Sequence, residues 1–133
     1  MNTRLDDFGV VARQRSAQLI VDRSRGFLDR DHAVTLTGDF DSQPNEDAYV
    51  PNNPNSPFVD VTTLVSETRD TQKYGHIKTY TVFDYGEHTK KRIDYVFLAP
   101  KHSSQGVGIL ETRFDDDVAN SDHRTAVTDV ILK

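Results

Sequence analysis

Apolar and polar positions follow two different periods along this chain, and the change of period separates an opening helix from a mainly strand-forming remainder. Between residues 9 and 30, apolar side chains recur at helical spacing while charged side chains take the other faces. This period predicts an amphipathic helix that covers a sheet. The expected stripe consists of Val10, Ala17, Val21 and Leu28, with Ile20 and Phe27 beside it.

Short β-branched runs predict several strands after this helix. The stretch HAVTLTGDF, residues 32–40, is an apolar run stopped by Gly38, which is typical of a buried strand. Residues 51–57 are only Pro, Asn and Ser and predict a loop, residues 59–65 fit either a helix or a strand, and residues 66–75 are expected to be polar and exposed. Further strands are expected at 76–85, 92–99, 106–114 and 124–132.

The composition fits one domain that spans residues 1–133. An apolar fraction of 35% and a charged fraction of 28% are ordinary for a soluble globular protein. No apolar run approaches the ~20 residues of a membrane helix, and the N-terminus lacks the apolar segment of a signal peptide. The net charge of -5 provides no basic field for nucleic acid, so a phosphate-bearing substrate needs local cations or a metal ion.

Several familiar sites are excluded by the sequence. The absence of cysteine rules out disulfides, thiolate metal sites and a cysteine nucleophile. There is neither a Gly-rich phosphate loop of the G-x-x-x-x-G-K-[ST] type nor a G-x-S-x-G elbow. The segment that starts at Asp115 begins like a calcium loop, but Asn120 stands where that loop needs Gly and Ala126 where it needs Glu.

Three acidic or acid–histidine groups remain, each at the end of an expected strand. They are Asp39 and Asp41 in GDFD, Asp94 in RIDYVF, and Asp122 with His123 in SDHR. Asp94 lies in an otherwise apolar run, where a carboxylate is costly unless it meets a cation or a hydrogen-bond donor. A histidine brought against this acid would satisfy it and become more basic itself.

Each group also has an interpretation without chemistry. GDFD is compatible with a simple exit from a strand into a turn, and SDHR with a cap or a turn. Asp94 could pair with Arg92 or Lys91. The basic run 90–92 fits either a contact with a polyanion or a solvated hairpin turn.

The order of the motifs resembles one known superfamily. GDFD-x-x-P, TYTVF ahead of RIDYVF, and a closing SDHR-x-x-V-x-D-V occur in the order seen in the endonuclease/exonuclease/phosphatase superfamily, and NTRLDDFGVVAR looks like its NTHLD segment. This superfamily of metal-dependent phosphodiesterases includes DNase I-like nucleases, neutral sphingomyelinases and inositol phosphatases. The resemblance covers essentially the whole chain but begins in the middle of the family's domain.

The resemblance implies an α+β fold that is half of a DNase I-like four-layer α/β sandwich, with one mainly antiparallel sheet and a covering helix. Residues 1–133 would form the C-terminal part of the domain, and the N-terminal half would be absent. The metal-binding Glu of that half has no counterpart before Glu46, which follows GDFD and is in the wrong place. The sheet face meant for the missing half would then expose apolar side chains, which a partner chain could cover.

The resemblance also implies roles for individual residues. Asp39 would orient or deprotonate the attacking water, and Asp94 would fix His123 close to the scissile phosphate. Asp122 would be a ligand of the catalytic cation, Mg²⁺ (or Mn²⁺), which favours a few carboxylates together with water and substrate oxygens. These assignments would make the chain a metal-dependent hydrolase of phosphodiester or phosphomonoester bonds.

Three positions would contact the substrate, and two of them depart from the family pattern. Asn2 matches the Asn that positions the phosphate. Arg4 stands where many relatives have His, and an arginine cannot act as a general acid although it can clamp a phosphate. Asp41 stands where the family has an Asn whose amide donates to the phosphate; an ionised Asp only accepts, so the loss of a donor is favoured over an added metal ligand.

Two functions stay open from the sequence. One is an Mg²⁺-dependent phosphoester hydrolase whose substrate, whether nucleic acid, lipid or small molecule, is not resolved and whose activity needs the complete domain. The alternative is a catalytically inactive fragment or pseudoenzyme that acts as an interaction module. The negative net charge argues mildly against tight binding of duplex DNA.

Overall fold

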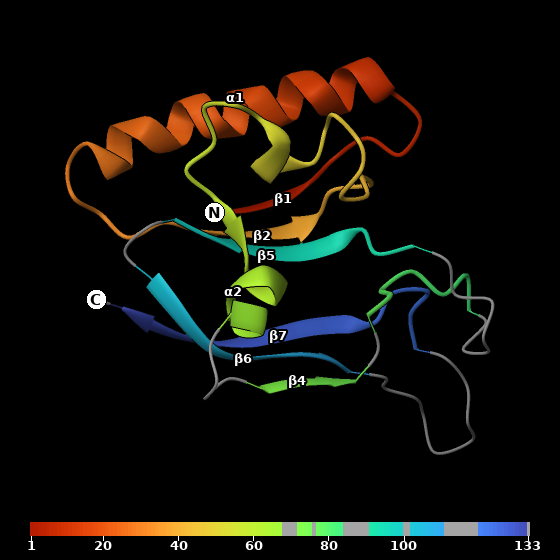
Figure 1. Cartoon of the computed structure of the whole chain (residues 1–133). Coiled ribbons are helices and arrows are strands. Elements are labelled where there is room, and N and C mark those ends of the chain that lie inside the picture. Colours follow the sequence, from red (N-terminus) through yellow and green to blue (C-terminus); the bar gives the residue numbers. More distant parts are fainter. Residues whose placement is uncertain (68–71, 76, 84–90, 100–101, 111–119, 133) are drawn as a thin grey trace.

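A computed structural model describes residues 1–67, 72–75, 77–83, 91–99, 102–110 and 120–132. Within these ranges the strands form two sheets, with the orders β1-β2-β5-β3 and β4-β6-β7. Figure 1 shows α1 along one side of the four-stranded sheet and the three-stranded sheet on its other side. The elements are β1 (Asn2–Arg4), α1 (Val10–Leu28), β2 (Thr35–Asp39), the 3-10 turn η1 (Val50–Asn52), β3 (Val59–Asp60), α2 (Val61–Glu67), β4 (Gln72–Gly75), β5 (Asp94–Leu98), β6 (His102–Leu110) and β7 (Thr125–Leu132).

The mixed α and β architecture confirms the expected fold class, but the described strands form two sheets instead of one. In the four-stranded sheet, β1 runs parallel to β2, and β5 runs antiparallel to both β2 and β3. In the other sheet, β6 pairs parallel with β4 and antiparallel with β7. The last strand therefore belongs to the second layer, which a hydrophobicity pattern along one chain does not reveal.

The alternation of side chains along β2 and β5 builds two different faces. On the face toward α1, Leu36, Phe40, Tyr95 and Phe97 are buried in one core with residues of the helix. On the opposite face, Val96 and Leu98 of β5 pack with Val61 and Val65 of α2, and Val130 of β7 joins this smaller core. The acids Asp39 and Asp94 lie on this second face, at the ends of their strands.

The opening helix is confirmed, with a buried stripe rotated from the expected one. Ala17 and Val21 are buried as predicted, whereas Val10 is 55% exposed. Arg13 and Ser24 take buried positions at helical spacing instead. The Arg13 guanidinium donates to the backbone carbonyls of Asp6 and Asp7, and this contact accounts for a cation on the buried side of an amphipathic helix.

One strand expectation is wrong, and one strand was not expected. Residues 66–75, expected to be polar and exposed, contribute β4 at Gln72–Gly75. Residues 77–83 form no strand; their described ladder contacts are single bridges from Tyr80 to Lys91 and to His123. Positive φ angles of 51° at Val82 and 62° at Phe83 take the backbone out of the extended region and stop any strand here. The rest of the expected strand, 84–90, lies outside the described residues.

The other expected strands are confirmed with shifted bounds, as β2, β5, β6 and β7, except that residues 111–114 of the strand expected at 106–114 lie outside the described residues. The ambiguous segment 59–65 contains both options, because the short strand β3 leads directly into α2. Part of the predicted Pro/Asn loop forms η1. Among the described residues, none of the helices has the length and apolarity needed to cross a bilayer.

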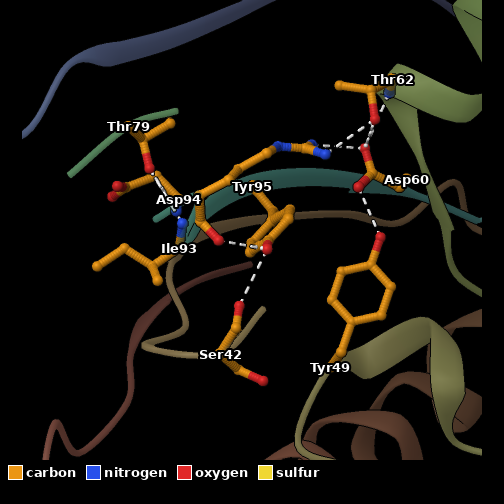
Figure 2. Close-up of polar contacts among 9 residues, drawn as sticks. Ser42, Tyr49, Asp60, Thr62, Thr79, Ile93, Asp94 and Tyr95 are labelled. Carbon is orange, nitrogen blue, oxygen red and sulfur yellow. Dashed lines mark hydrogen bonds and ion pairs between the residues drawn. The ribbon is translucent and has the colours of Figure 1, made fainter. Parts of the chain in front are cut away.

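A buried polar network fixes the start of β5 (Figure 2). One Arg92 nitrogen donates to Asp60 Oδ1 over 2.7 Å and another donates to the Thr62 hydroxyl over 2.9 Å. The Tyr49 hydroxyl donates to the other oxygen of Asp60 over 2.6 Å. The Arg92 guanidinium also lies over the ring of Tyr95, 4.4 Å from its centroid. Arg92 is thus paired with Asp60, and not with Asp94 as the sequence allowed.

We predict that Gly38→Ala destabilises the fold. Gly38 has a φ of 146°, and a Cβ there would lie 1.9 Å from the Thr3 carbonyl oxygen on the neighbouring strand. The strain and the forced separation of β1 from β2 should lower the free energy of unfolding by about 2–5 kcal/mol in urea titrations. The control is Gly26→Ala in α1, where a Cβ meets nothing within 4 Å; this variant should gain about 0.5–1 kcal/mol. Equal stability of the two variants would contradict the prediction.

Asp60→Ala is expected to lower the free energy of unfolding by about 3–5 kcal/mol, because it leaves the Arg92 charge buried without its partner. Tyr49→Phe, which removes one hydrogen bond to the same carboxylate, should cost about 1 kcal/mol.

The same pair predicts a pH dependence of stability. Burial raises the pKa of Asp60, but hydrogen bonds and charge from Arg92 outweigh it, so its pKa lies below the ordinary value of 3.8. The stabilisation from Asp60 is therefore complete above pH 3.8 and is lost as the pH falls through the lowered pKa. Acid titration of Asp60→Asn beside the wild-type chain measures this contribution. A constant difference down to the lowest pH at which both fold would contradict the prediction.

Candidate active site

The register of the central strands brings two acids opposite each other. Asp39, the last residue of β2, pairs with Asp94, the first residue of β5. The neighbouring pair is hydrogen-bonded, since the Phe40 N–H donates to the Ile93 carbonyl over 2.8 Å. Hydrogen-bonded and non-hydrogen-bonded pairs alternate between antiparallel strands, so Asp39 and Asp94 form a non-hydrogen-bonded pair, in which side chains approach most closely. Both carboxylates therefore lie side by side where the two inner strands of the sheet end.

His123 reaches the ends of these two strands from the loop that precedes β7. Its Nδ1 lies 2.8 Å from Asp94 Oδ2, and the two side chains are 23% and 20% exposed. An ionised carboxylate only accepts hydrogen bonds, so Nδ1 carries the proton and donates a hydrogen bond to Asp94. Nε2 is then the nitrogen that can accept a proton or, in the imidazolium, donate one. The Tyr80 ring packs edge-on against the imidazole, with 5.2 Å between the centroids.

Asp39 lies in a less favourable environment for a negative charge. Burial raises its pKa above the ordinary value of 3.8, and the nearby Asp94 charge raises it further. The Asp41 N–H, which donates to Asp39 Oδ1 over 3.1 Å, opposes this shift, as do the charges of His123 and Arg4. Arg4 Nε is 3.6 Å from Asp39 Oδ2, but the Arg4 side chain is 77% exposed, so this ion pair contributes little.

An open pocket of about 540 Å³ lies beside these acids. Its wall combines the edge of the four-stranded sheet with the start of β7 and includes Asp39, Asp94, Asn2 and Arg4. The Asn2 amide donates to the Thr37 hydroxyl over 2.9 Å on the same wall. The pocket thus presents acids and an amide together with an exposed cation, a mixture suited to a polar, anionic ligand with a counter-ion.

The structure brings together three residues that the sequence placed in the site. One ligand atom each from Asp39, Asp94 and His123 lies within 4.8 Å of the others, a grouping able to hold a metal ion. Asn2 and Arg4 line the pocket beside them. Their individual roles remain predictions.

Asp41 and Asp122 are placed differently. Asp41 follows Phe40 with a φ of 43°, and its pKa is raised by burial and by the charges of Asp39 and Asp7. Asp122 does not belong to the Asp39–Asp94–His123 grouping found among the described residues. Its backbone carbonyl accepts hydrogen bonds from Thr81. The metal-ligand role of Asp122 therefore remains a prediction from the resemblance.

Sequence reasoning missed two contributors to this region. Arg124 is 3% exposed and lines the pocket. Its one signal in the sequence was its place as the last residue of the motif SDHR. Tyr80 contacts the imidazole through a segment that was expected to be an ordinary strand. The signal for Tyr80 was the motif TYTVF, whose position before RIDYVF suited a strand as well as a site.

We predict that Asp39→Asn stabilises the chain near neutral pH. Because the pKa of Asp39 is raised on folding, its contribution to stability falls as the pH rises above 3.8 through the raised value, and the penalty is complete at neutral pH. Asparagine keeps the acceptor for the Asp41 N–H and removes the like-charge pair with Asp94, which is worth about 0.5–1 kcal/mol. Urea titrations at pH 7 and at pH 3 measure the change. A loss of stability at pH 7 would contradict the environment described for Asp39.

Comparisons with known proteins identify solved structures that have a similar fold. No family model and no curated protein matches the sequence. Among solved structures, an endonuclease/exonuclease/phosphatase family protein from Bacteroides thetaiotaomicron is 23% identical with a TM-score of 0.80 over 99% of this chain and 49% of its own. The mannosyl-6-phosphatase Bt3783 of the same organism is 23% identical with a TM-score of 0.79, over 98% of this chain and 50% of its own.

A more distant structure has the same arrangement. TDP2 from D. rerio, complexed with a single-strand DNA product, is 15% identical with a TM-score of 0.72, over 98% of this chain and 55% of its own. The chain therefore spans about half the length of the structures that it matches. The motif resemblance and the shared fold agree: this chain has the fold of one half of a DNase I-like domain, as found in the endonuclease/exonuclease/phosphatase proteins.

Proposed function

We propose that this chain supplies one part of the active site of a divalent-metal-dependent phosphoester hydrolase. The observation that carries the proposal is the convergence of Asp39, Asp94 and His123 within 4.8 Å, with Asp39 and Asp94 lining a polar pocket. The three side chains come from two strands and a loop that are far apart in the sequence. A carboxylate-oriented imidazole beside a second acid of raised pKa is a combination suited to proton transfer.

The Asp94–His123 pair would act on the phosphate. With Nδ1 held by Asp94, Nε2 is the imidazole's remaining hydrogen-bonding atom and would be the one to contact the substrate. In the charged form Nε2 donates a hydrogen bond to a phosphoryl oxygen, whose negative charge increases in the transition state. Asp94 keeps the ring in this orientation and stabilises its positive charge.

Asp39 would orient or deprotonate the attacking water. Its raised pKa makes it a better base than an ordinary exposed aspartate, since proton affinity rises with pKa. Arg4, exposed on the neighbouring strand, has the reach and the charge to bind a phosphate, and the Asn2 amide lies on the same wall. Substrate phosphate near Arg4 would replace its weak contact with Asp39.

The residues fit a hard divalent cation in part. The carboxylates of Asp39 and Asp94 would provide oxygen ligands while His123 keeps its hydrogen-bonding role, and Asp122 is the additional ligand that the resemblance implies. Such a set suits Mg²⁺ or Mn²⁺, which take carboxylates and leave other positions for water and substrate oxygens. When bound, the cation would polarise the phosphoryl group and lower the pKa of a coordinated water.

The site is proposed to work as part of a complete domain. This chain covers about half of each matched structure, and its pocket is open on one side of the described sheet. The complementary half would come from a longer polypeptide or from a partner chain, and would supply further metal ligands and the rest of the substrate pocket. The substrate is a phosphate ester of nucleic acid, lipid or small-molecule origin. The named neighbours include a mannosyl-6-phosphatase and a protein bound to single-strand DNA.

The half-length match also supports a second candidate, a catalytically inactive module that serves only for interaction. Asp41 favours it, because a second, partly buried acid near Asp39 replaces the amide expected from the motif and repels a phosphate. The two candidates differ in whether the site binds a cation and turns over substrate.

Hydrolysis of bis(p-nitrophenyl) phosphate and p-nitrophenyl phosphate by the complete domain tests the proposal. We expect activity with Mg²⁺ or Mn²⁺ and none with EDTA. Asp39→Ala and His123→Ala should each lower kcat by about 10²-fold or more, because each removes a proton-transferring or charge-stabilising group. His32→Ala and Asp22→Ala are the matched controls, since both side chains are exposed on or after α1. Equal activity in all four variants would sink the assignment of the site.

Mn²⁺ titration of the isolated chain separates the two candidates when hydrolysis is not observed. Paramagnetic broadening confined to NMR signals of Asp39, Asp94 and His123 supports the metal-dependent enzyme. Signals that stay sharp at millimolar Mn²⁺, together with an inactive complete domain, would favour the interaction module.

Asp41→Asn is predicted to raise phosphoester hydrolysis by the complete domain. The substitution replaces an acceptor that repels phosphate with an amide that can donate to it, and the positive φ of 43° suits Asn at least as well as Asp. One hydrogen bond to a charged group corresponds to about 1.5–3 kcal/mol, a rise of roughly 10-fold or more in kcat/KM. Asp47→Asn, an exposed acid that contacts Gln14, is the control. A fall in kcat/KM for Asp41→Asn would support a direct role of this acid, for example as a metal ligand.

A further inference from the structure

One short segment contacts both partners of the Asp94–His123 pair. Thr79 and Thr81 are fully buried, and Tyr80 lies between them. The backbone of Tyr80 forms antiparallel bridges to Lys91 on one side and to His123 on the other. The segment 79–81 is thus a spacer between the chain that leads into β5 and the loop that leads into β7.

The Thr79 hydroxyl anchors the start of β5. It accepts the Ile93 N–H over 3.0 Å and the Asp94 N–H over 3.1 Å (Figure 2). In the non-hydrogen-bonded pair with Asp39, the Asp94 N–H points away from β2. The strand on that side, β3, pairs only with the far end of β5, at Phe97 and Leu98. The hydroxyl therefore takes the place that a strand neighbour would occupy beside Asp94.

The same segment fixes the loop that carries His123. The Arg124 N–H donates to the Thr79 carbonyl over 2.7 Å, and the Thr81 N–H donates to the Asp122 carbonyl over 2.7 Å. The Thr81 hydroxyl donates to that carbonyl as well, over 2.8 Å. The residues before and after His123 are thereby tied to one rigid segment, and the Tyr80 ring closes against the imidazole.

We propose that the segment 79–81 is a positioning element of the active site, with the Thr79 hydroxyl setting the place of Asp94 and the Tyr80 ring setting the plane of His123. The proposal rests on the proposed function for the purpose of the pair, but its geometry is independent of any substrate. A hydroxyl oxygen accepts two hydrogen bonds, and both are used here by backbone donors. Valine, which has the same shape as threonine, lacks the oxygen that accepts these two hydrogen bonds.

Replacement of Thr79 by valine isolates the hydroxyl. Valine has the same shape and leaves the Ile93 and Asp94 donors buried without a partner, so the start of β5 must shift toward other acceptors or water. Thr79→Ser keeps the oxygen and is expected to retain the wild-type geometry. The matched control is Thr63→Val on the exposed side of α2.

Long-range proton–nitrogen NMR of the chain detects the Nδ1 proton that His123 donates to Asp94, and His123→Asn assigns it. We expect this signal in the wild-type chain, in Thr79→Ser and in Thr63→Val, and its loss by solvent exchange in Thr79→Val. Tyr80→Leu, at a half-buried position that tolerates an apolar side chain, is expected to lose it too. A persistent, unshifted signal in folded Thr79→Val would overturn the proposal; if that variant does not fold, a persistent signal in Tyr80→Leu would overturn it.

Hydrolysis by the complete domain gives a second readout that separates this proposal from the proposed function. We expect kcat to fall about 10- to 100-fold in Thr79→Val with an unchanged KM, and to be restored in Thr79→Ser, because reaction rates are sensitive to small displacements of an oriented group. If Thr79→Val loses the Nδ1 signal but the complete wild-type domain has no phosphoesterase activity, the positioning role is supported and the proposed hydrolase function is refuted. Full activity of Thr79→Val beside active-site variants that are inactive would refute the positioning role alone.

Discussion

The pairing of Asp39 with Asp94 across two antiparallel strands is the constraint on which the site depends. It places two carboxylates where side chains are closest, and burial together with the Asp94 charge raises the pKa of Asp39. His123 donates a hydrogen bond to Asp94, while the contacts of Asp39 among the described residues include a backbone N–H and an exposed arginine. The two adjacent acids therefore differ: Asp94 has a fixed partner in His123, and Asp39 is available for a proton or a cation.

Two ion-paired side chains, Arg92 and Asp94, lie only two residues apart at the start of β5 and have different surroundings. Arg92 is held by the buried Asp60 and stacks on Tyr95, with the Tyr49 hydroxyl on the opposite carboxylate oxygen. Asp94 and His123 lie at the pocket and remain partly exposed. The first group fixes the backbone from the α1 side of the sheet, so the second can keep a geometry that solvent and ligand reach.

Much of this arrangement could be predicted from the sequence, and the failures have physical causes. The opening helix, β2 and β5 have strong periods, and the Asp94–His123 pair follows from an acid in an apolar strand together with the motif order. β4 was missed because its run of four residues is polar. The division into two sheets depends on which strands pair across long sequence separations, and apolar patterning does not encode that choice.

Local conformations and polar pairings were harder still. The positive φ angles of Val82 and Phe83 contradict the β propensity of both residues, so tertiary contacts override propensity there. The partner of Arg92 lies 32 residues away, beyond any local pattern of charges. The contribution of Thr79 depends on a hydroxyl that replaces a missing strand, and such a contact appears only once the neighbouring strand is known to be short.

The alternation of faces along β2 and β5 has a consequence for how this chain can vary. Leu36, Tyr95 and Phe97 fill the core under α1, while Asp39 and Asp94 project from the opposite face of the same strands. Side chains on the two faces have different neighbours, so a substitution on one face leaves the packing contacts of the other face in place. Residues that line the pocket, such as Asn2 and Arg4, could therefore be exchanged while the hydrophobic interior and its packing are inherited unchanged.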